Sequence, residues 1–296
     1  MPERPTLVCA GNVTLDVAVA PDGRRTTAVG GDAVFASLAA RLAGGEPQIL
    51  APLGNDVPDA VADVVRLAGT PPEDLPARDL PTVLDVVRYR ADGSRTWELV
   101  HGERHFEEMS PGPADVTPAM LAADGVLLSG MALAAQLALS SWLRPRTSAT
   151  VYLDPQEDYV PGNERALLEA VAACDVFLPS EVEALALARV DDVEDAIRCF
   201  LEVVPVVVVK RAEHGCLVAT RRGRTPVVVP AERVVPTDST GAGDAFCGAF
   251  AVEHLRSGDP VAAARAASAV ARVAVSGVGV DALADAVRSM ESEVAR

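Results

Sequence analysis

Short apolar runs alternate with segments of helical periodicity from about residue 125 to the end of the chain. The apolar runs span 125–130, 150–155, 175–180 and 203–210. Helical segments lie between or after them, at 164–173, 194–202, 243–256, 260–275 and 281–295. After Lys210, two further apolar runs flank the basic turn 221–224 and predict a hairpin. The alternation is typical of β-α units and predicts an α/β fold with a mostly parallel sheet.

The N-terminal part is less regular and contains two strand-like excursions. Strand and helix patterns alternate over 6–12, 30–45, 47–54 and 59–69. The excursions lie at 16–29 and 82–103, and the second has two runs joined by residues 91–94, Ala-Asp-Gly-Ser, which favour a hairpin turn. Because the chain has no internal repeat and no low-complexity linker, we expect residues 1–296 to form one domain into which these strands insert a small β-sheet.

Composition indicates a globular protein with few aromatic residues. Hydrophobic residues make up 49% of the chain and aromatic residues 4%, so the core must consist mainly of Ala, Val and Leu. The five cysteines are an odd number without a CxxC pair, and we expect reduced, buried thiols of a cytoplasmic protein. The apolar run 125–143 contains polar residues and divides into a strand and a helix, so we expect no membrane span. The N-terminus lacks the layout of a signal peptide.

The charge balance argues against a nucleic-acid partner. The chain has 26 Lys and Arg against 42 Asp and Glu, a formal charge of −16. Phosphate backbones are held mainly by Lys and Arg, whereas a small anionic ligand needs only a few local cations and backbone amides. Lys210 is the only lysine.

The segment 238–250 carries the clearest chemistry. Gly241 and Gly243 permit a tight turn before a helix, and the free amides and positive dipole end of such a helix bind anions. Asp244 falls in the first helical turn, where it could accept a proton from an attacking hydroxyl beside a phosphoryl group. The alternative is an ordinary aspartate at the start of a helix.

Other nucleotide-binding and hydrolytic motifs are absent from the sequence. Lys210 is followed by Arg211, so no Walker A loop exists. Phe246 stands where the dinucleotide fingerprint requires a third glycine. No serine lies in a Gly-x-Ser-x-Gly elbow.

The sequence resembles the ribokinase-like (PfkB) carbohydrate kinases over essentially its whole length. Residues 238–244 are similar to the family signature Asp-Thr-Thr-Gly-Ala-Gly-Asp, with Ser239 in place of one Thr. The supporting motifs follow in the family's order, namely Gly11 to Asp16, Gly30-Gly31, 53–56, 179–183, Lys210 to Gly215 and 276–279. The resemblance implies a three-layer αβα domain with a mostly parallel central sheet and a small β-sheet lid.

It also implies roles for individual residues. Asp244 would be the catalytic base, and Gly241, Ala242 and Gly243 would form the anion hole for the transferring phosphate. The substrate would contact Asp16, Gly30, Gly31, Asp32, Phe35 and Arg88. The nucleotide would contact Lys210, Gly215, Thr240 and Gly243.

The cofactors implied by the family are ATP and Mg²⁺, with a potassium-like ion in many members. Glu183 would act on magnesium through water. Asp238, Thr240, Ser276 and Gly279 resemble the monovalent cation site. For Lys210, the alternative is a solvated lysine at the end of a strand.

Three departures from the family pattern bear on the chemistry. Ser180 replaces an Asn of the magnesium motif, and Ala212 replaces a glycine before Gly215. Phe35 stands where ribokinase itself has Asn, so D-ribose is not the favoured substrate.

The excursion 82–103 would be the lid, which in the family covers the sugar and often pairs with the lid of a second subunit. Alternation puts Arg88 and Arg90 on one face of a strand, from which they could contact an anionic group. Solvated arginines on an exposed sheet are the alternative. A homodimer through the lid is therefore an expectation.

Together these observations predict an ATP-dependent phosphotransferase that acts on a hydroxyl of a sugar or sugar-like molecule. The alternatives are a nucleoside (adenosine-like) kinase, in which Phe35 could stack on a base, and a non-catalytic binding protein of the same fold. The partner is expected to be a small molecule, not a nucleic acid or a membrane.

Overall fold

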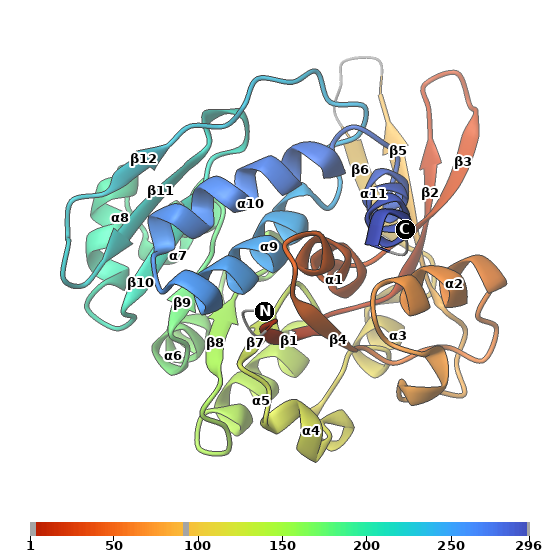
Figure 1. The fold of residues 1–296 in the computed structure, drawn as a ribbon, viewed down its shortest axis with the longest axis horizontal. Coiled ribbons are helices and arrows are strands. Elements are labelled where there is room, and N and C mark those ends of the chain that lie inside the picture. Colours follow the sequence, from red (N-terminus) through yellow and green to blue (C-terminus); the bar gives the residue numbers. More distant parts are fainter. Residues whose placement is uncertain (1–3, 91–94, 295–296) are drawn as a thin grey trace.

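The computed structural model describes residues 4–90 and 95–294, and these form two sheets (Figure 1). The larger sheet contains, in spatial order, β12 (Val227–Val229), β11 (Cys216–Thr220), β10 (Val206–Lys210), β9 (Val176–Phe177), β8 (Thr150–Leu153), β7 (Gly125–Leu128), β1 (Thr6–Ala10) and β4 (Glu46–Leu50). The strands from β10 to β4 are parallel, and β11 and β12 add an antiparallel edge. The predicted mostly parallel sheet is confirmed.

Helices cover both faces of this sheet and complete three layers (Figure 1). One face carries α1 (Asp32–Leu42), α2 (Asp59–Leu67), α9 (Ala242–Ser257), α10 (Pro260–Ala274) and α11 (Asp281–Val294). The other carries α4 (Pro118–Leu121), α5 (Leu133–Leu143), α6 (Glu164–Ala173), α7 (Glu181–Ala188) and α8 (Val193–Phe200). Along β1, Leu7 and Cys9 belong to the first core and Val8 and Ala10 to the second. Strand β7, in the middle of the sheet, is apolar throughout because both of its faces are buried.

A smaller sheet is built from the two excursions. Its order is β3 (Arg25–Gly30), β2 (Thr14–Val19), β5 (Val83–Tyr89) and β6 (Arg95–Leu99). Each excursion supplies one antiparallel pair, and the parallel pair β2–β5 joins them. We call this sheet, residues 14–30 and 83–99, the lid. The turn predicted at 91–94 lies outside the described residues.

The structure departs from the sequence-based expectations in a few places. Strand β6 ends at Leu99, and a helix that was not predicted, α3 (Gly102–Glu108), follows it. Helix α7 was also missed. The expectation that every cysteine is buried is wrong for Cys199, which is exposed, whereas the other four free thiols are buried.

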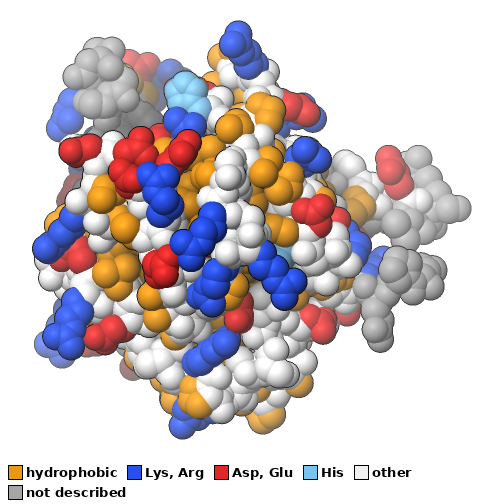
Figure 2. Space-filling model, turned by 90° about the vertical axis from the view of Figure 1, so that its left-hand side faces the viewer, with side chains coloured by type: hydrophobic (Ala, Val, Ile, Leu, Met, Phe, Trp, Pro, Cys, Tyr) orange, Lys and Arg blue, Asp and Glu red, His pale blue; other side chains and the backbone are white. Residues whose placement is uncertain are grey.

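Charges of both signs are interspersed on the face of the molecule where β12 and α8 lie (Figure 2). Arg224 pairs with Glu202 at 3.1 Å, and Arg211 pairs with Glu181 at 3.0 Å. The arginines on this face therefore do not build a field of one sign. In the part of the chain that the structure describes, no helix is long and apolar enough to cross a bilayer.

Candidate active site

The parallel strands bring polar side chains to one edge of the main sheet. Asp154 directly follows β8, Ser180 follows β9, and Lys210 is the last residue of β10. In open α/β sheets, ligands bind at the carboxyl ends of the strands. A pocket of about 550 Å³ lies there, lined by the lid, by α1 and by the start of α9.

Helix α9 begins on this pocket. Its N-cap is Gly241, whose φ of 71° lies in the left-handed region, and a Cβ there would come within 2.3 Å of the Phe35 ring. Glycine is therefore required both by the backbone and by Phe35, which is 2% exposed. The first amides of the helix and its positive dipole end face the pocket and form an anion cradle.

Asp244 and Asp32 are a partly buried carboxyl pair on the pocket wall. Burial and the neighbouring Asp154 raise the pKa of Asp244 to about 7, and Lys210 opposes this rise. Burial, followed by Asp244, raises the pKa of Asp32 well above its ordinary value, and the Asp32 side chain hydrogen-bonds to Asp244. Both carboxyl groups therefore bind a proton more readily than an exposed aspartate does, and Asp244 gains or loses one near neutral pH, as a general base must.

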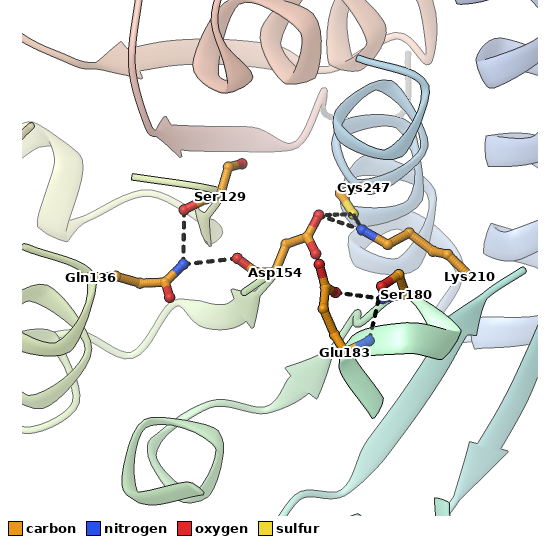
Figure 3. A network of polar contacts seen from close by, with 7 residues as sticks. All are labelled: Ser129, Gln136, Asp154, Ser180, Glu183, Lys210 and Cys247. Carbon is orange, nitrogen blue, oxygen red and sulfur yellow. Dashed lines mark hydrogen bonds and ion pairs between the residues drawn. The ribbon is translucent and has the colours of Figure 1, made fainter. Parts of the chain in front are cut away.

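The Lys210 side chain is only 15% exposed and is ion-paired, so its interpretation as a solvated lysine is wrong (Figure 3). Its Nζ lies 2.5 Å from Asp154 Oδ2 and 3.6 Å from Cys247 Sγ. The Cys247 thiol donates to the same carboxylate oxygen at 3.1 Å. Burial opposes the charged amine, but Asp154 and Cys247 outweigh it and raise the pKa of Lys210. A Cβ on Gly243 would lie 3.4 Å from Nζ, so the charge sits beside the first turn of α9.

Glu183 caps helix α7 and faces Asp154 (Figure 3). Its Oε2 accepts the Ser180 amide at 2.6 Å, and the Ser180 hydroxyl accepts the Glu183 amide at 3.2 Å. Burial, then Asp154, raises the pKa of Glu183 to about 7. Asp154 Oδ1 is buried without a hydrogen-bond partner among the described residues. Ser180, which replaces the expected Asn, thus serves to hold the glutamate.

Two facing carboxylates with an unpaired oxygen suit Mg²⁺, which prefers oxygen ligands and often takes one or two carboxylates plus substrate phosphates. Within the described chain, no three His, Cys, Asp or Glu side chains form a complete metal cluster. Phosphate oxygens and water would therefore supply the remaining ligands.

Asp16 lines the pocket from β2. Thr14 Oγ1 donates to its Oδ1 at 2.7 Å, and burial raises the pKa of Asp16 to about 6. A Cβ on Gly30 would lie 2.1 Å from Asp16 Oδ2, and one on Gly31, whose φ is 101°, would lie 2.2 Å from the Asn12 carbonyl. The glycine pair therefore lets the chain pass close to Asp16 and Asn12. Of the two, only Gly31 is among the described residues that line the pocket.

Asp238 links the loop before α9 to the loop 276–279. Its Oδ1 accepts the Thr240 amide at 2.9 Å and its Oδ2 accepts the Gly279 amide at 3.3 Å. The Ser276 hydroxyl instead donates to the Val273 carbonyl at 2.7 Å. The structure thus brings together Asp238, Thr240 and Gly279 of the proposed cation site and turns Ser276 elsewhere.

Gly215 and Ala212 both have left-handed backbones at the turn into β11. Gly215 has a φ of 82°, and a Cβ there would lie 2.0 Å from the Val229 carbonyl. Ala212, which replaces a glycine, has a φ of 47°. A non-glycine residue in the left-handed region costs roughly 1–2 kcal/mol. Ala212 therefore lowers the free energy of unfolding relative to a glycine at this position.

Arg88 lies outside the pocket. It is exposed on β5 and pairs with Glu98 at 3.3 Å. Successive side chains of a strand point to opposite faces, and Asp85 on the same strand lines the pocket, so Arg88 occupies the outer face of the lid.

The pocket also holds residues that sequence analysis missed. Asp85 is the only polar residue in the run 83–87 of β5, a signal that could have identified it. Phe106 comes from α3, and Tyr159 comes from the short helix η3 (Glu157–Tyr159). Asp154 belongs to none of the sequence motifs, yet it contacts the side chains of both Lys210 and Cys247.

Comparison with known proteins gives the following similarities. The sequence profile of the pfkB family of carbohydrate kinases matches residues 105–286. A cytidine kinase from Thermococcus kodakarensis is 30% identical over 257 residues, which cover 84% of this chain and 88% of that kinase. A deoxyribokinase from Salmonella typhimurium is 38% identical over 112 residues, 36% of each chain.

Solved structures share the fold. An adenosine kinase from Sinorhizobium meliloti superposes with a TM-score of 0.79 at 17% identity, covering 98% of this chain and 100% of that one. A ribokinase from Thermotoga maritima gives a TM-score of 0.70 at 21% identity, covering 98% and 99%. The three-layer architecture with a separate small sheet is therefore that of ribokinase-like proteins.

Proposed function

The chain belongs to the pfkB family of carbohydrate kinases and is a phosphotransferase acting on a sugar or a nucleoside, and on that premise we propose that it transfers the γ-phosphate of ATP to a sugar hydroxyl of a nucleoside. The observation that carries the choice of a nucleoside is the mixed lining of the pocket. The lining includes carboxylates such as Asp16 and Asp244, and it also includes Leu99, Phe106 and Tyr159. Carboxylates suit sugar hydroxyls, and an apolar, aromatic surface suits a nucleobase. The 30% identity to a cytidine kinase supports the same choice.

In this mechanism Asp16 accepts hydrogen bonds from the sugar and orients it. Asp244 accepts the proton of the attacking hydroxyl, and Asp32 holds Asp244 in place through their hydrogen bond. The amides at the start of α9 and the Lys210 ammonium stabilise the charge on the transferring phosphoryl group. Magnesium, bound through Asp154 and Glu183 together with the phosphates, would neutralise part of that charge.

A free sugar is the second candidate acceptor. Asp16 and Asp85 are register partners on neighbouring strands, and both line the pocket, so the two carboxylates could accept several sugar hydroxyls. The partial match to a deoxyribokinase agrees with this candidate.

The test is ATP turnover by the parent protein and by Asp244→Asn with cytidine, uridine, adenosine, ribose and deoxyribose. We expect nucleoside turnover by the parent, and a loss of about 10²–10⁴-fold in kcat in the variant because the base is removed, while ATP binding measured by calorimetry persists. Asp281→Asn, which changes an exposed aspartate in the first turn of α11, is the control and should keep full turnover.

The outcomes are separable. Turnover by Asp244→Asn within threefold of the parent would show that Asp244 is not the base. Turnover of the sugars alone would select the second candidate.

A further inference from the structure

A row of register partners crosses the lid above the pocket. Ala28 on β3 pairs with Asp16 on β2, Asp16 with Asp85 on β5, and Asp85 with Leu99 on β6. Asp16, Asp85 and Leu99 all line the pocket. The row therefore passes from the carboxylate proposed to hold the sugar, through a second carboxylate, to an apolar side chain.

One oxygen of Asp85 has no hydrogen-bond partner in the part of the chain that the structure describes. Its Oδ1 is buried and makes no hydrogen bond to any described residue. Burial, followed by the nearby Asp16 and Glu103, raises the pKa of Asp85 to about 7. A buried acceptor without a partner destabilises the protein, and a hydrogen-bond donor on a ligand would remove that cost.

The pocket itself cannot supply a charged donor to Asp85. Its described lining contains six carboxylate residues and no Lys, Arg or His. A substrate with an anionic group beside Asp85 would meet only negative charge. A substrate with an N–H or O–H group there would donate a hydrogen bond to the carboxylate. The chemistry of the lining therefore demands a donor on the ligand.

The neighbours of Asp85 indicate which donor it meets. Leu99 is its register partner, and Phe106 on α3 lines the same pocket and belongs with Leu99 to one apolar cluster. A planar ring lying against these two side chains would present its edge to Asp85. The hydroxyls of the sugar would be closer to Asp16, one strand away.

From this arrangement we infer that Asp85 is a specificity residue that selects nucleosides whose base carries an exocyclic amino group, as in cytosine. The inference rests on the proposed function. An amino group donates to the carboxylate, whereas the carbonyl that replaces it in uracil presents lone pairs to an oxygen that already lacks a donor. The cytidine kinase to which the chain is similar is consistent with this choice.

The test compares kcat/KM for cytidine, uridine and 2′-deoxycytidine in the parent protein, Asp85→Asn and Glu98→Gln. We expect the parent to prefer cytidine over uridine by about tenfold or more, because leaving a buried acceptor unpaired weakens binding by roughly 5–150-fold. Asp85→Asn should lower that preference severalfold, because an amide offers a donor as well as an acceptor. Glu98→Gln changes an exposed lid carboxylate outside the pocket lining and should leave the preference unchanged.

Calorimetric Kd values for cytidine and uridine, measured without ATP, should show the same change in ratio as the rates. If Asp85→Asn alters the preference for cytidine over 2′-deoxycytidine but not over uridine, Asp85 contacts the 2′-hydroxyl and the inference is wrong. Equal turnover of cytidine and uridine by the parent would overturn the inference and leave the proposed function standing. Turnover of free sugars alone would overturn both.

Discussion

At the scale of single residues, the site depends on one cation among many carboxylates. Lys210 and Cys247 both donate to Oδ2 of Asp154, which leaves Oδ1 directed at Glu183 (Figure 3). The amine is thus held by the protein before any ligand arrives. A fixed charge needs no reorganisation when the phosphoryl group transfers, and such preorganised charges contribute strongly to catalysis.

Replacing Lys210 should therefore damage both stability and turnover. Lys210→Met leaves Asp154 buried without its counter-ion, which should lower the free energy of unfolding by about 3–5 kcal/mol. The lost charge should also reduce kcat by about 10²–10³-fold. Chemical denaturation and steady-state kinetics measure the two effects.

Arg211→Met is the matched control, since Arg211 is the next cation along the chain and pairs with Glu181 outside the pocket lining. It should change kcat little. A Lys210→Met protein that turns over within threefold of the parent would contradict the catalytic role of the amine.

At the scale of elements, the start of α9 differs from the starts of α8 and α10. Those two helices begin with Asp192 and Asp259, whose side chains accept hydrogen bonds from the first backbone amides. Helix α9 begins with Gly241, which has no side chain to do this. The start of α9 on the pocket is therefore not capped by a side chain.

Gly241→Ala should abolish turnover, because the added Cβ meets both a left-handed backbone and the Phe35 ring. Gly258→Ala provides the control. Gly258 ends the same helix with a φ of 67°, but nothing lies within 4 Å of its added Cβ. It should lose roughly 1–2 kcal/mol of stability and keep its activity. Equal activity losses in the two variants would show that backbone strain in α9, and not the clash with Phe35, causes the loss of turnover.

Some elements were predictable from the sequence and others were not. Central strands such as β7 and β8 were predictable because burial on both faces makes them apolar. Helix α3 was missed because Gly102–Glu108 is too short for a periodic signal. Arg88 was assigned to the substrate because alternation shows which residues share a strand face but not which face meets the pocket.

The site was predictable where a local motif exists, as in residues 238–244. It was not predictable where the chemistry depends on residues far apart in sequence. Asp154 acquires its role from Lys210, which lies 56 positions along the chain. Asp85 acquires its role from its register with Asp16 across the parallel pair β2–β5.

At the scale of the whole molecule, the site concentrates negative charge within a chain that already carries −16. Burial raises the pKa of Asp16 to about 6 and that of Asp85, Glu183 and Asp244 to about 7. The unfolded values lie near 4. Between the unfolded pKa values near 4 and the folded values of about 6 to 7, the folded state binds more protons than the unfolded state. The free energy of unfolding therefore falls as pH rises through this range.

The ligand-free protein should therefore be more stable at pH 5 than at pH 8. Each of these groups contributes up to about 1.4 kcal/mol per pH unit within its window, and coupling between them reduces the sum. Thermal melts at several pH values measure the trend, and Asp85→Asn should make it shallower. A Tm that increases from pH 5 to pH 8 would contradict the burial of these carboxyl groups.

The solitary lysine gives the molecule a chemical handle. Apart from the α-amino group, Lys210 Nζ is the only amine that an acylating reagent can modify, and it lies buried against Asp154. Labelling at this position therefore requires the ion pair with Asp154 to open and the reagent to reach Nζ beside the first turn of α9. Mass spectrometry of that single adduct would measure how fast the site opens around Lys210, without any engineered probe.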